Sequence, residues 1–332
     1  MNQQLYQIIQ ALADGAYHTG QSIGQQHDIT RSAVWKYMQQ LPEKEVMLES
    51  SRSQGYCIPG GLSLLDEHTI ATHLDAGTRA RLCDIHVVPE TTSTTQHVLT
   101  VGNHPGQSGT VCFAEYQTHG KGRRERSWHA PFASGLLCSM TWHFNAGFSA
   151  LAGLSLVTGL SLYQALKHYG ASEGLCVKWP NDLVYRGEKV AGVLTEFRGE
   201  GYGETQVVIS FGMNISVPKQ FMTDVTFPWT DVAYMVATPP DRNAIAAQVL
   251  NQLVTNLMIF EQQGFGAFLA DWQTADATLG KSVKLLGLNQ ETFGIVEGIT
   301  PLGELLIRLE HGQVQAFHFG EISLRNAQGG YV

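Results

Sequence analysis

The stretch LCVKWPNDLVYRGEKVAGVL, residues 175–194, carries the strongest structural signal in the chain. A short apolar run ends at Pro180 and Asn181, which favour turns because proline fixes φ and asparagine tolerates unusual backbone angles. The remainder predicts a β-hairpin whose outgoing strand begins at Asp182 and whose return strand begins at Lys189. A carboxylate and an ammonium are therefore expected at the ends of neighbouring strands, where a site can form.

The setting of Lys189 leaves two interpretations open. The return strand is apolar on both faces, and burying an unpaired ammonium is costly. The lysine must therefore sit at the mouth of the strand or be paired with an anion. A lysine that extends its charge into solvent at the end of a hairpin satisfies the pattern without any function. A lysine that binds an anionic ligand satisfies it equally.

A second basic feature lies upstream in GKGRRER, residues 120–126, which follows a strand-like run at 111–117. Glycine lets the backbone approach a ligand closely, and arginine offers forked donors that match phosphate or carboxylate. The pattern is neither a Walker loop nor a Rossmann fingerprint, because residues 128–132 are a poor helix start. A phosphate-binding loop, a solvated basic loop and a nucleic-acid patch all remain open.

Length and composition describe an ordinary chain of 332 residues, 43% of them hydrophobic, which suits about two or three domains. No run of about eighteen apolar residues occurs and the N-terminus lacks a signal-peptide pattern, so we expect a cytoplasmic protein without membrane contact. The five cysteines are odd in number and far apart, which predicts neither a disulfide framework nor a zinc site. The scattered histidines predict no metal cage either, although magnesium carried by a nucleotide would leave little trace.

Residues 1–60 have the pattern of a DNA-binding unit, although the net charge of −8 argues against a protein that coats nucleic acid. Apolar residues at helical spacing predict a first helix from Leu5 to Leu12. Thr19 and Thr30 are expected to cap two further helices, which completes the spacing of a helix-turn-helix. The residues expected to contact DNA from the third helix are Arg31, Ser32 and Lys36.

Two short runs after the third helix, 46–48 and 56–58, predict the two-stranded wing of a winged helix-turn-helix, whose tip can touch phosphates. Within residues 1–60, four Lys and Arg residues stand against five Asp and Glu residues, a net charge of −1. Residues 1–60 therefore carry little of the positive charge that is expected of a DNA-binding surface. Small helix-turn-helix units also serve as protein-interaction modules, so that alternative stays open.

The rest of the chain is predicted to form a mixed body of helices and strands, followed by a small β unit. The segment 59–61 marks the end of the first unit. A strand is expected at 206–217, within which the Asn214 amide must be satisfied by the backbone or by the ring nitrogens of a ligand. Helices are predicted at 66–74, 149–169 and 242–262. Short β-like runs typical of a small barrel follow at 282–286, 292–296, 305–309 and 314–319.

Together these features resemble the family of bifunctional biotin-protein ligases and biotin operon repressors, over essentially the whole chain. The motifs that carry the resemblance are Gln117 with Gly120-Lys121-Gly122-Arg123-Arg124, Lys178-Trp179-Pro180-Asn181-Asp182, Lys189-Val190-Ala191-Gly192, Gly212-Met213-Asn214 and Gly320-Glu321-Ile322-Ser323-Leu324-Arg325. The resemblance implies an α+β fold. Its domains are a winged helix-turn-helix at 1–61, a mixed-sheet ligase domain like that of class II synthetases at 62–275, and a small SH3-like β-barrel at 276–332.

The activity that the resemblance implies has two steps. Biotin and ATP, with Mg²⁺, form biotinyl-5′-AMP with loss of pyrophosphate, and a lysine of a biotin carboxyl carrier protein then attacks this intermediate. Bound biotinyl-AMP is implied to promote a homodimer, which represses biotin-synthesis genes by binding operator DNA through the N-terminal domain. A ligand-sensing regulator without turnover and a lipoate-protein ligase are the alternatives.

The position of each residue in these motifs implies its role. The catalytic residues are Lys189, Arg123 and Asp182. The biotin-binding residues are Ser93, Thr94, Gln117, Arg123, Lys189 and Gly192. The residues that bind ATP or the adenylate are Gly120, Lys121, Gly122, Arg124, Trp128, Asn181, Asn214, Trp229 and Arg325.

Four positions depart from the pattern of the family. Thr92 and Thr95 stand where the biotin segment usually has an acidic residue and an asparagine. In the basic loop Lys121 replaces an arginine and Glu125 replaces a glycine. Glutamate removes a flexible point from the loop and repels phosphate. We therefore expect ligase activity to survive, with greater leak of the intermediate.

Overall fold

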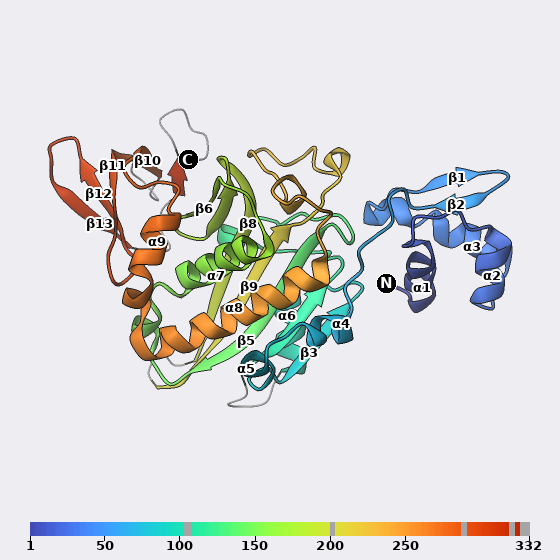
Figure 1. Cartoon of the computed structure of the whole chain (residues 1–332), viewed down its shortest axis with the longest axis horizontal. Coiled ribbons are helices and arrows are strands. Elements are labelled where there is room, and N and C mark those ends of the chain that lie inside the picture. The colour runs from blue at the N-terminus through green and yellow to red at the C-terminus, as the bar shows by residue number, and fades with distance from the viewer. Residues whose placement is uncertain (103–107, 200–202, 287–290, 319–322, 326–332) are drawn as a thin grey trace.

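The computed structural model describes residues 1–102, 108–199, 203–286, 291–318 and 323–325. Residues 323–325 are described by their backbone alone. Within these residues the strands form three sheets, of two, seven and five strands. Figure 1 shows the seven-stranded sheet in the middle, with the N-terminal helices and the C-terminal strands at opposite ends of the molecule. The predicted α+β architecture, with a helix-turn-helix unit, a mixed-sheet body and a C-terminal antiparallel unit, is confirmed.

The N-terminal unit is a helix-turn-helix with a short wing. Thr19 and Thr30 accept hydrogen bonds from the backbone N–H groups of Ser22 and Ala33, which satisfies free donors at the starts of their helices. The predicted apolar face of the first helix, including Leu5, is buried. The elements are α1 (Gln3–Leu12), α2 (Gly20–Gln26), α3 (Arg31–Met38), η1 (Leu41–Lys44), β1 (Glu49–Ser51) and β2 (Gly55–Cys57).

The prediction of a first wing strand at 46–48 is wrong, because the strand lies at Glu49–Ser51 and pairs antiparallel with Gly55–Cys57. Val46 is buried and Leu48 packs against the same cluster. The apolar character of 46–48 therefore reflects core filling and not strand pairing. The wing itself is polar and partly exposed, as its place at a tip requires.

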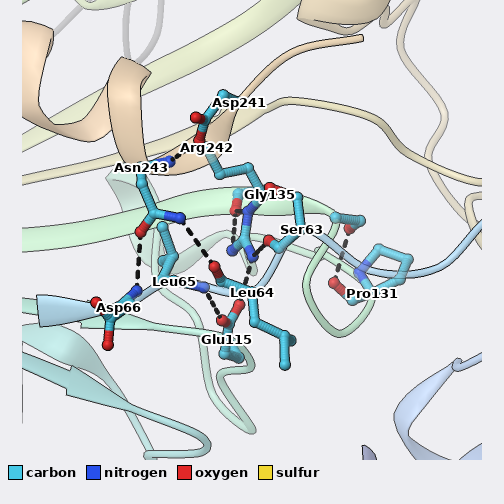
Figure 2. Close-up of polar contacts among 11 residues, drawn as sticks. Ser63, Leu64, Leu65, Asp66, Glu115, Pro131, Gly135, Asp241, Arg242 and Asn243 are labelled. Carbon is cyan, nitrogen blue, oxygen red and sulfur yellow. Dashed lines mark hydrogen bonds and ion pairs between the residues drawn. The ribbon is translucent and has the colours of Figure 1, made fainter. Parts of the chain in front are cut away.

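The segment that joins the first unit to the body is held by a buried polar cluster, shown in Figure 2. Arg242, 2% exposed, pairs with Glu115 at 2.6 Å and donates to the carbonyl oxygen of Ser63 at 2.7 Å. Glu115 accepts from the backbone N–H of Leu65 at 2.6 Å, and Asn243 accepts from that of Asp66 at 2.8 Å. Removing one partner of such a pair costs about 3–5 kcal/mol, so this segment is firmly fixed.

The central sheet has the order β3-β4-β5-β9-β8-β7-β6, with β3 and β4 parallel and the other neighbours antiparallel. Its strands cover both faces with apolar side chains. Val111 and Phe113 of β4 belong to the main core, whereas Cys112 between them packs with Val98 on the opposite face. The strands are β3 (Asp84–Val88), β4 (Thr110–Ala114), β5 (Gly135–Phe144), β6 (Leu175–Lys178), β7 (Asp182–Tyr185), β8 (Glu188–Arg198) and β9 (Thr205–Asn214).

Two long helices, α7 (Leu154–Tyr169) and α8 (Arg242–Gln263), cover one face of this sheet, as Figure 1 shows. The other face carries α6 (Thr94–Val101). By length and composition the segment Phe148–Tyr169 could also span a membrane. However, 72% of the apolar 18-residue stretch within it is buried inside the protein. The shorter elements are α4 (Glu67–Thr72), α5 (Ala76–Arg79), η2 (Arg123–Glu125), η3 (Phe148–Leu151), η4 (Lys219–Phe221), η5 (Val232–Tyr234), η6 (Phe265–Phe268) and α9 (Leu269–Ala275).

Two helix predictions need correction. The helix expected at 149–169 begins only at Leu154, because Gly153 takes a left-handed conformation with φ 86° and the preceding residues form a separate 3-10 turn. The helix expected at 66–74 ends at Thr72, and a second short helix follows, capped by Asp75. The helix expected at 242–262 is confirmed to within one residue.

The C-terminal unit is an SH3-like antiparallel sheet in the order β13-β12-β11-β10-β14. Val283 and Ile307 belong to the same buried cluster as the central sheet, and the indole N–H of Trp179 donates to the carbonyl oxygen of Gly303 at 3.0 Å. This unit therefore packs directly on the segment 175–194, through Trp179. Its strands are β10 (Ser282–Leu286), β11 (Glu291–Ile299), β12 (Leu305–Leu309), β13 (Val314–Phe317) and β14 (Ser323–Arg325).

Candidate active site

The predicted hairpin forms, and it brings its two charged ends together. Arg186 and Gly187 at the turn both have positive φ, 51° and 85°, the backbone that suits a tight hairpin turn. A register shift in the β7–β8 pair falls between Leu183 and Val184. Lys189 Nζ lies 2.7 Å from Asp182 Oδ1, and both side chains are mostly buried, 14% and 13% exposed. Lys189 is therefore ion-paired inside a cleft and does not extend into solvent.

The basic loop reaches the same hairpin. Arg123 Nη1 donates to Asn181 Oδ1 at 3.1 Å, and Asn181 Nδ2 donates to the carbonyl oxygen of Val193 at 2.8 Å. Burial lowers the pKa of the Arg123 guanidinium, and the nearby Asp182 carboxylate opposes that shift. An arginine stays charged despite such a shift, so the two basic features of the sequence meet as cations in one place.

The loop at 120–128 is closed by its own backbone. Trp128 N–H donates to the Gly120 carbonyl oxygen at 2.9 Å, and a Cβ at position 120 would stand 2.5 Å from the Trp128 carbonyl oxygen. Arg124 and Glu125 both adopt left-handed backbone, with φ of 56° and 58°, at a cost of about 1–2 kcal/mol per residue. Glu125 thus takes a conformation that glycine adopts without strain.

Trp128 packs against two glycines of the sheet. A Cβ at Gly212 would collide with its indole ring, and a Cβ at Gly192 would lie 3.3 Å from Trp128 Cζ3. Lys189 Nζ lies 5.7 Å from the centroid of the Trp128 ring and 5.5 Å from that of Phe227, within range of a cation–π contact. The glycine positions of the motifs are therefore explained by the close approach of this ring.

A first cavity, of about 130 Å³, is lined by Lys189, Asp182 and Arg123. On one side of it, Gln117 Oε1 accepts hydrogen bonds from Thr94 N–H at 2.7 Å and from the Thr94 hydroxyl at 3.1 Å. The Thr95 hydroxyl lies 2.9 Å from that of Ser210. The predicted site residues that line this cavity are Ser93, Thr94, Gln117, Lys121, Gly122, Arg123, Arg124, Trp128, Asn181, Asp182, Lys189 and Gly192.

A second cavity, of about 1000 Å³, lies beyond Trp128, which lines both. Asn214 and Trp229, both predicted to bind the adenylate, line it as well. Asn214 Nδ2 donates to the Thr230 carbonyl oxygen at 3.0 Å, whereas the buried Oδ1 accepts no hydrogen bond from the described residues. The backbone therefore satisfies the amide N–H of Asn214, as one of the two interpretations predicts. A contact with a ligand stays a prediction, and Oδ1 would make it with a donor such as an amino group.

Gly120, a predicted adenylate residue, does not line either cavity. Gly120 is buried at the base of the basic loop, where it allows the loop to close. Arg325 pairs through its backbone with Lys284, and its side chain lies outside the described residues. The motif residues Gly320, Glu321 and Ile322 also lie outside the described part of the chain.

The residues predicted to contact DNA are exposed on one helix. Arg31, Ser32 and Lys36 lie on α3, and their side chains reach solvent. Trp35 on the same helix is also exposed, by 55%, and the sequence prediction does not include it. The placement suits a helix that enters a DNA groove.

Sequence reasoning missed other residues of the cavities. Lys178 and Ser210 line the first cavity, and Glu45 and His129 line the second. Lys178 belongs to the quoted stretch and is only 2% exposed, so its buried charge was a usable signal. Glu45 is distant in sequence from every motif, and no local pattern indicates its place.

Comparison with known proteins matches three parts of the chain. Residues 4–57 match the HTH domain, residues 87–214 the biotin/lipoate A/B protein ligase family, and residues 278–325 the biotin protein ligase C-terminal domain. The bifunctional ligase/repressor BirA of Salmonella typhimurium is 36% identical over 322 residues, which cover 97% of both chains. The chain belongs to this family of bifunctional biotin protein ligases and repressors.

Two further members of the family agree with this assignment. The bifunctional ligase/repressor BirA of Escherichia coli is 35% identical over 97% of both chains. The structure of the biotin protein ligase from Aquifex aeolicus in complex with biotin and ATP is 28% identical, has a TM-score of 0.62, and covers 74% of this chain and 99% of its own. The resemblance found in the sequence is therefore confirmed across the three units of the fold.

Proposed function

We infer that the chain is a biotin protein ligase that activates biotin with ATP to biotinyl-5′-AMP and transfers biotin to a lysine of a biotin carboxyl carrier protein. It is also a transcriptional repressor, as its helix-turn-helix and its bifunctional relatives indicate. The observation that carries the enzymatic part is the meeting of Lys189, Asp182 and Arg123 in one cavity. A second cavity, in which Asn214 Oδ1 accepts no hydrogen bond from the described residues, lies next to it.

In the first step a carboxylate oxygen of biotin attacks the α-phosphorus of ATP, the bond to the bridging oxygen of the β-phosphate breaks, and pyrophosphate leaves. Two anions must approach each other, and groups that stabilise charge as it shifts usually contribute most to catalysis. Lys189 and Arg123 are cations on the wall of this cavity. We assign the neutralisation of the carboxylate and the α-phosphate to them.

The ring end of biotin is assigned to the opposite wall of the first cavity. Ser93 and Thr94 are buried there, and the Gln117 carbonyl oxygen is already used by Thr94. The Gln117 amide N–H groups are thereby left to donate to the ureido carbonyl of biotin. Gly192 lets Lys189 and Trp128 approach the sheet and border the ligand, because a Cβ there would lie 3.2 Å from Lys189 Nζ and 3.3 Å from Trp128 Cζ3.

In the second step the amine of the carrier lysine attacks the acyl carbon, and AMP leaves with the electron pair of the broken C–O bond. A free lysine has a pKa of about 10.4, so its ammonium must lose a proton before it can attack. Asp182 is the carboxylate on the wall of the first cavity. We assign to it the orientation of the incoming amine and the acceptance of its proton.

The adenylate is proposed to extend past Trp128 into the second cavity, where Asn214 Oδ1 accepts from the adenine amino group and Trp229 packs on the ring. Lys121, Gly122, Arg124 and Asn181 border the phosphate, Arg325 approaches it from the C-terminal sheet, and Gly120 lets the loop close and exclude water. In the described part of the chain no three His, Cys, Asp or Glu side chains gather to hold a metal ion. We therefore propose that Mg²⁺ arrives with ATP, bound by its phosphates.

The repressor function is assigned to the exposed face of α3. We propose that Arg31, Ser32 and Lys36 contact operator DNA, and that a homodimer formed with biotinyl-AMP presents two such helices to a two-fold operator. The proposed place of action is the cytoplasm, without contact with a membrane. The proposed domains remain 1–61, 62–275 and 276–332.

Biotin-dependent exchange of pyrophosphate into ATP tests this function. We expect biotin to support exchange, lipoate to fail, and labelled biotin to appear on a carrier protein. Exchange with lipoate and none with biotin would identify a lipoate ligase instead. Biotin binding without any exchange would identify a ligand-sensing regulator.

A further inference from the structure

A residue of the helix-turn-helix unit reaches the second cavity. Glu45 follows η1, shortly after the DNA-contacting helix α3, and it lines the cavity together with His129 and Asn214. Its Oε1 lies 3.1 Å from His129 Nε2. The wall of the cavity assigned to the nucleotide is therefore made partly by the N-terminal unit.

His129 carries this contact onward to the rest of the wall. Its Nε2 lies 3.0 Å from the Phe221 carbonyl oxygen as well as close to Glu45. A carbonyl oxygen only accepts hydrogen bonds, so Nε2 must bear a proton, which it shares between the two oxygens. Phe221 belongs to the segment 220–229, which lines the second cavity throughout.

The same segment is fixed at its other end by the catalytic hairpin. Lys189 N–H donates to the Pro228 carbonyl oxygen at 2.9 Å, and Thr230 N–H donates to the Lys189 carbonyl oxygen at 2.9 Å. The wall is thus held by the backbone of Lys189 on one side and by His129 on the other. Only the His129 attachment involves the N-terminal unit among these contacts of the described residues.

Glu45 is held in an unfavourable state. Its φ of 58° lies in the left-handed region, and its Oε2 is buried without a hydrogen-bond partner among the described residues. Burial raises the pKa of its carboxyl, His129 opposes the shift, and Asp224 adds to it. Local strain of this kind is concentrated at functional positions.

We propose that Glu45 and His129 are positioning residues for the nucleotide, which hold the segment 220–229 so that the affinity for ATP depends on the helix-turn-helix unit. The proposal rests on the ligase function above and adds to it a residue outside the ligase motifs. Neither side chain is assigned a contact with the reacting atoms. Biotin binding in the first cavity should be unaffected, because neither residue lines it.

The test is steady-state pyrophosphate exchange with the full chain, in which KM for ATP, KM for biotin and kcat are measured separately. We expect E45A and H129A each to raise KM for ATP about three- to tenfold, the range of a lost charge-assisted hydrogen bond at a partly exposed site. KM for biotin and kcat should stay within about twofold. The double variant E45A/H129A should raise KM for ATP no more than either single variant, because each single change already breaks the contact between Glu45 and His129.

Three further variants separate positioning from general damage. E45Q keeps an acceptor for His129 Nε2–H and should recover most of the affinity for ATP. E43A removes the same charge from an exposed neighbour, and K44A breaks a different ion pair across this interface, with Glu90 at 2.7 Å. Both should leave KM for ATP unchanged.

The proposal would be overturned by an unchanged KM for ATP in E45A, or by a parallel loss of kcat and of affinity for biotin. An equal effect of E43A would overturn it as well. A wild-type chain without biotin-dependent exchange would instead refute the ligase function itself, which keeps the two failures distinct.

Discussion

The two ends of the site differ in how their polar groups are satisfied. At the reacting end, Lys189 is paired with Asp182 at 2.7 Å and Arg123 donates to Asn181 at 3.1 Å. At the nucleotide end, Asn214 Oδ1 and Trp128 Nε1 are buried without hydrogen-bond partners among the described residues. Buried polar atoms of this kind are costly until something bonds to them. We therefore propose that the first end is assembled before ligand arrives and that the second is completed by ligand.

This difference predicts different kinetic signatures. Groups at the reacting end act on charge that shifts during the reaction, so their loss should lower the rate. Groups at the nucleotide end bind ground state and transition state alike, so their loss should raise KM for ATP with little change in kcat.

The largest effect is expected from Lys189→Gln. This change removes the cation assigned to the carboxylate and the α-phosphate, and it should lower the rate of biotinyl-5′-AMP formation about 10²- to 10³-fold. Single-turnover measurement of the adenylate gives this rate. Lys281→Gln removes the same charge from an exposed position outside both cavities and should change nothing. A Lys189→Gln chain that forms the adenylate at the normal rate would contradict the predicted kinetic difference between the two ends of the site.

Asn214→Ala should have a smaller effect, and this effect should be on KM for ATP instead of on the reaction rate. Loss of the Asn214 Oδ1 acceptor should raise KM for ATP about tenfold, in line with a buried hydrogen bond, while KM for biotin stays unchanged. Competition by ATP analogues that lack the adenine amino group provides the control. Such an analogue should bind the variant and the wild type equally, and continued preference for the amino group in the variant would exclude the assignment.

The smallest expected effect concerns the loop that joins the two ends. Glu125→Gly relieves left-handed strain of about 1–2 kcal/mol and removes repulsion toward phosphate, so release of biotinyl-5′-AMP should slow about two- to fivefold. Glu125→Gln removes the charge alone and should give only part of the gain. Adenylate dissociation measured by a chase with unlabelled ligand decides the matter, and an unchanged rate in Glu125→Gly would contradict the predicted leak.

The sequence predicted those parts of the molecule that local rules determine. Local patterns correctly predicted the caps at Thr19 and Thr30, the hairpin after Asp182 and the long helix from Arg242. Each of these features depends on residues that are close in the chain. The first wing strand was misplaced because apolar residues fill a core as readily as they form a strand. The break before α7 depends on the left-handed Gly153, which the surrounding apolar run concealed.

For the site, the motifs identified most residues but not their mutual contacts. The pairing of Lys189 with Asp182 follows from the register of two adjacent strands and could have been anticipated. The approach of Arg123 to Asn181 spans distant segments, and spacing alone does not indicate it. Glu45 was unpredictable for the same reason, since only the packing of one unit on another brings it to the cavity.

Lys189 and Asp182, although paired, are proposed to serve different steps, and the variant Asp182→Asn separates these steps. Both half-reactions should be followed in one preparation, adenylate formation by rapid quench and biotin transfer from preformed adenylate to the carrier protein. We expect adenylate formation within about threefold of normal and transfer slower by about 10²- to 10⁴-fold, the range of a lost general base. Equal loss in both steps, or normal transfer, would contradict this proposal.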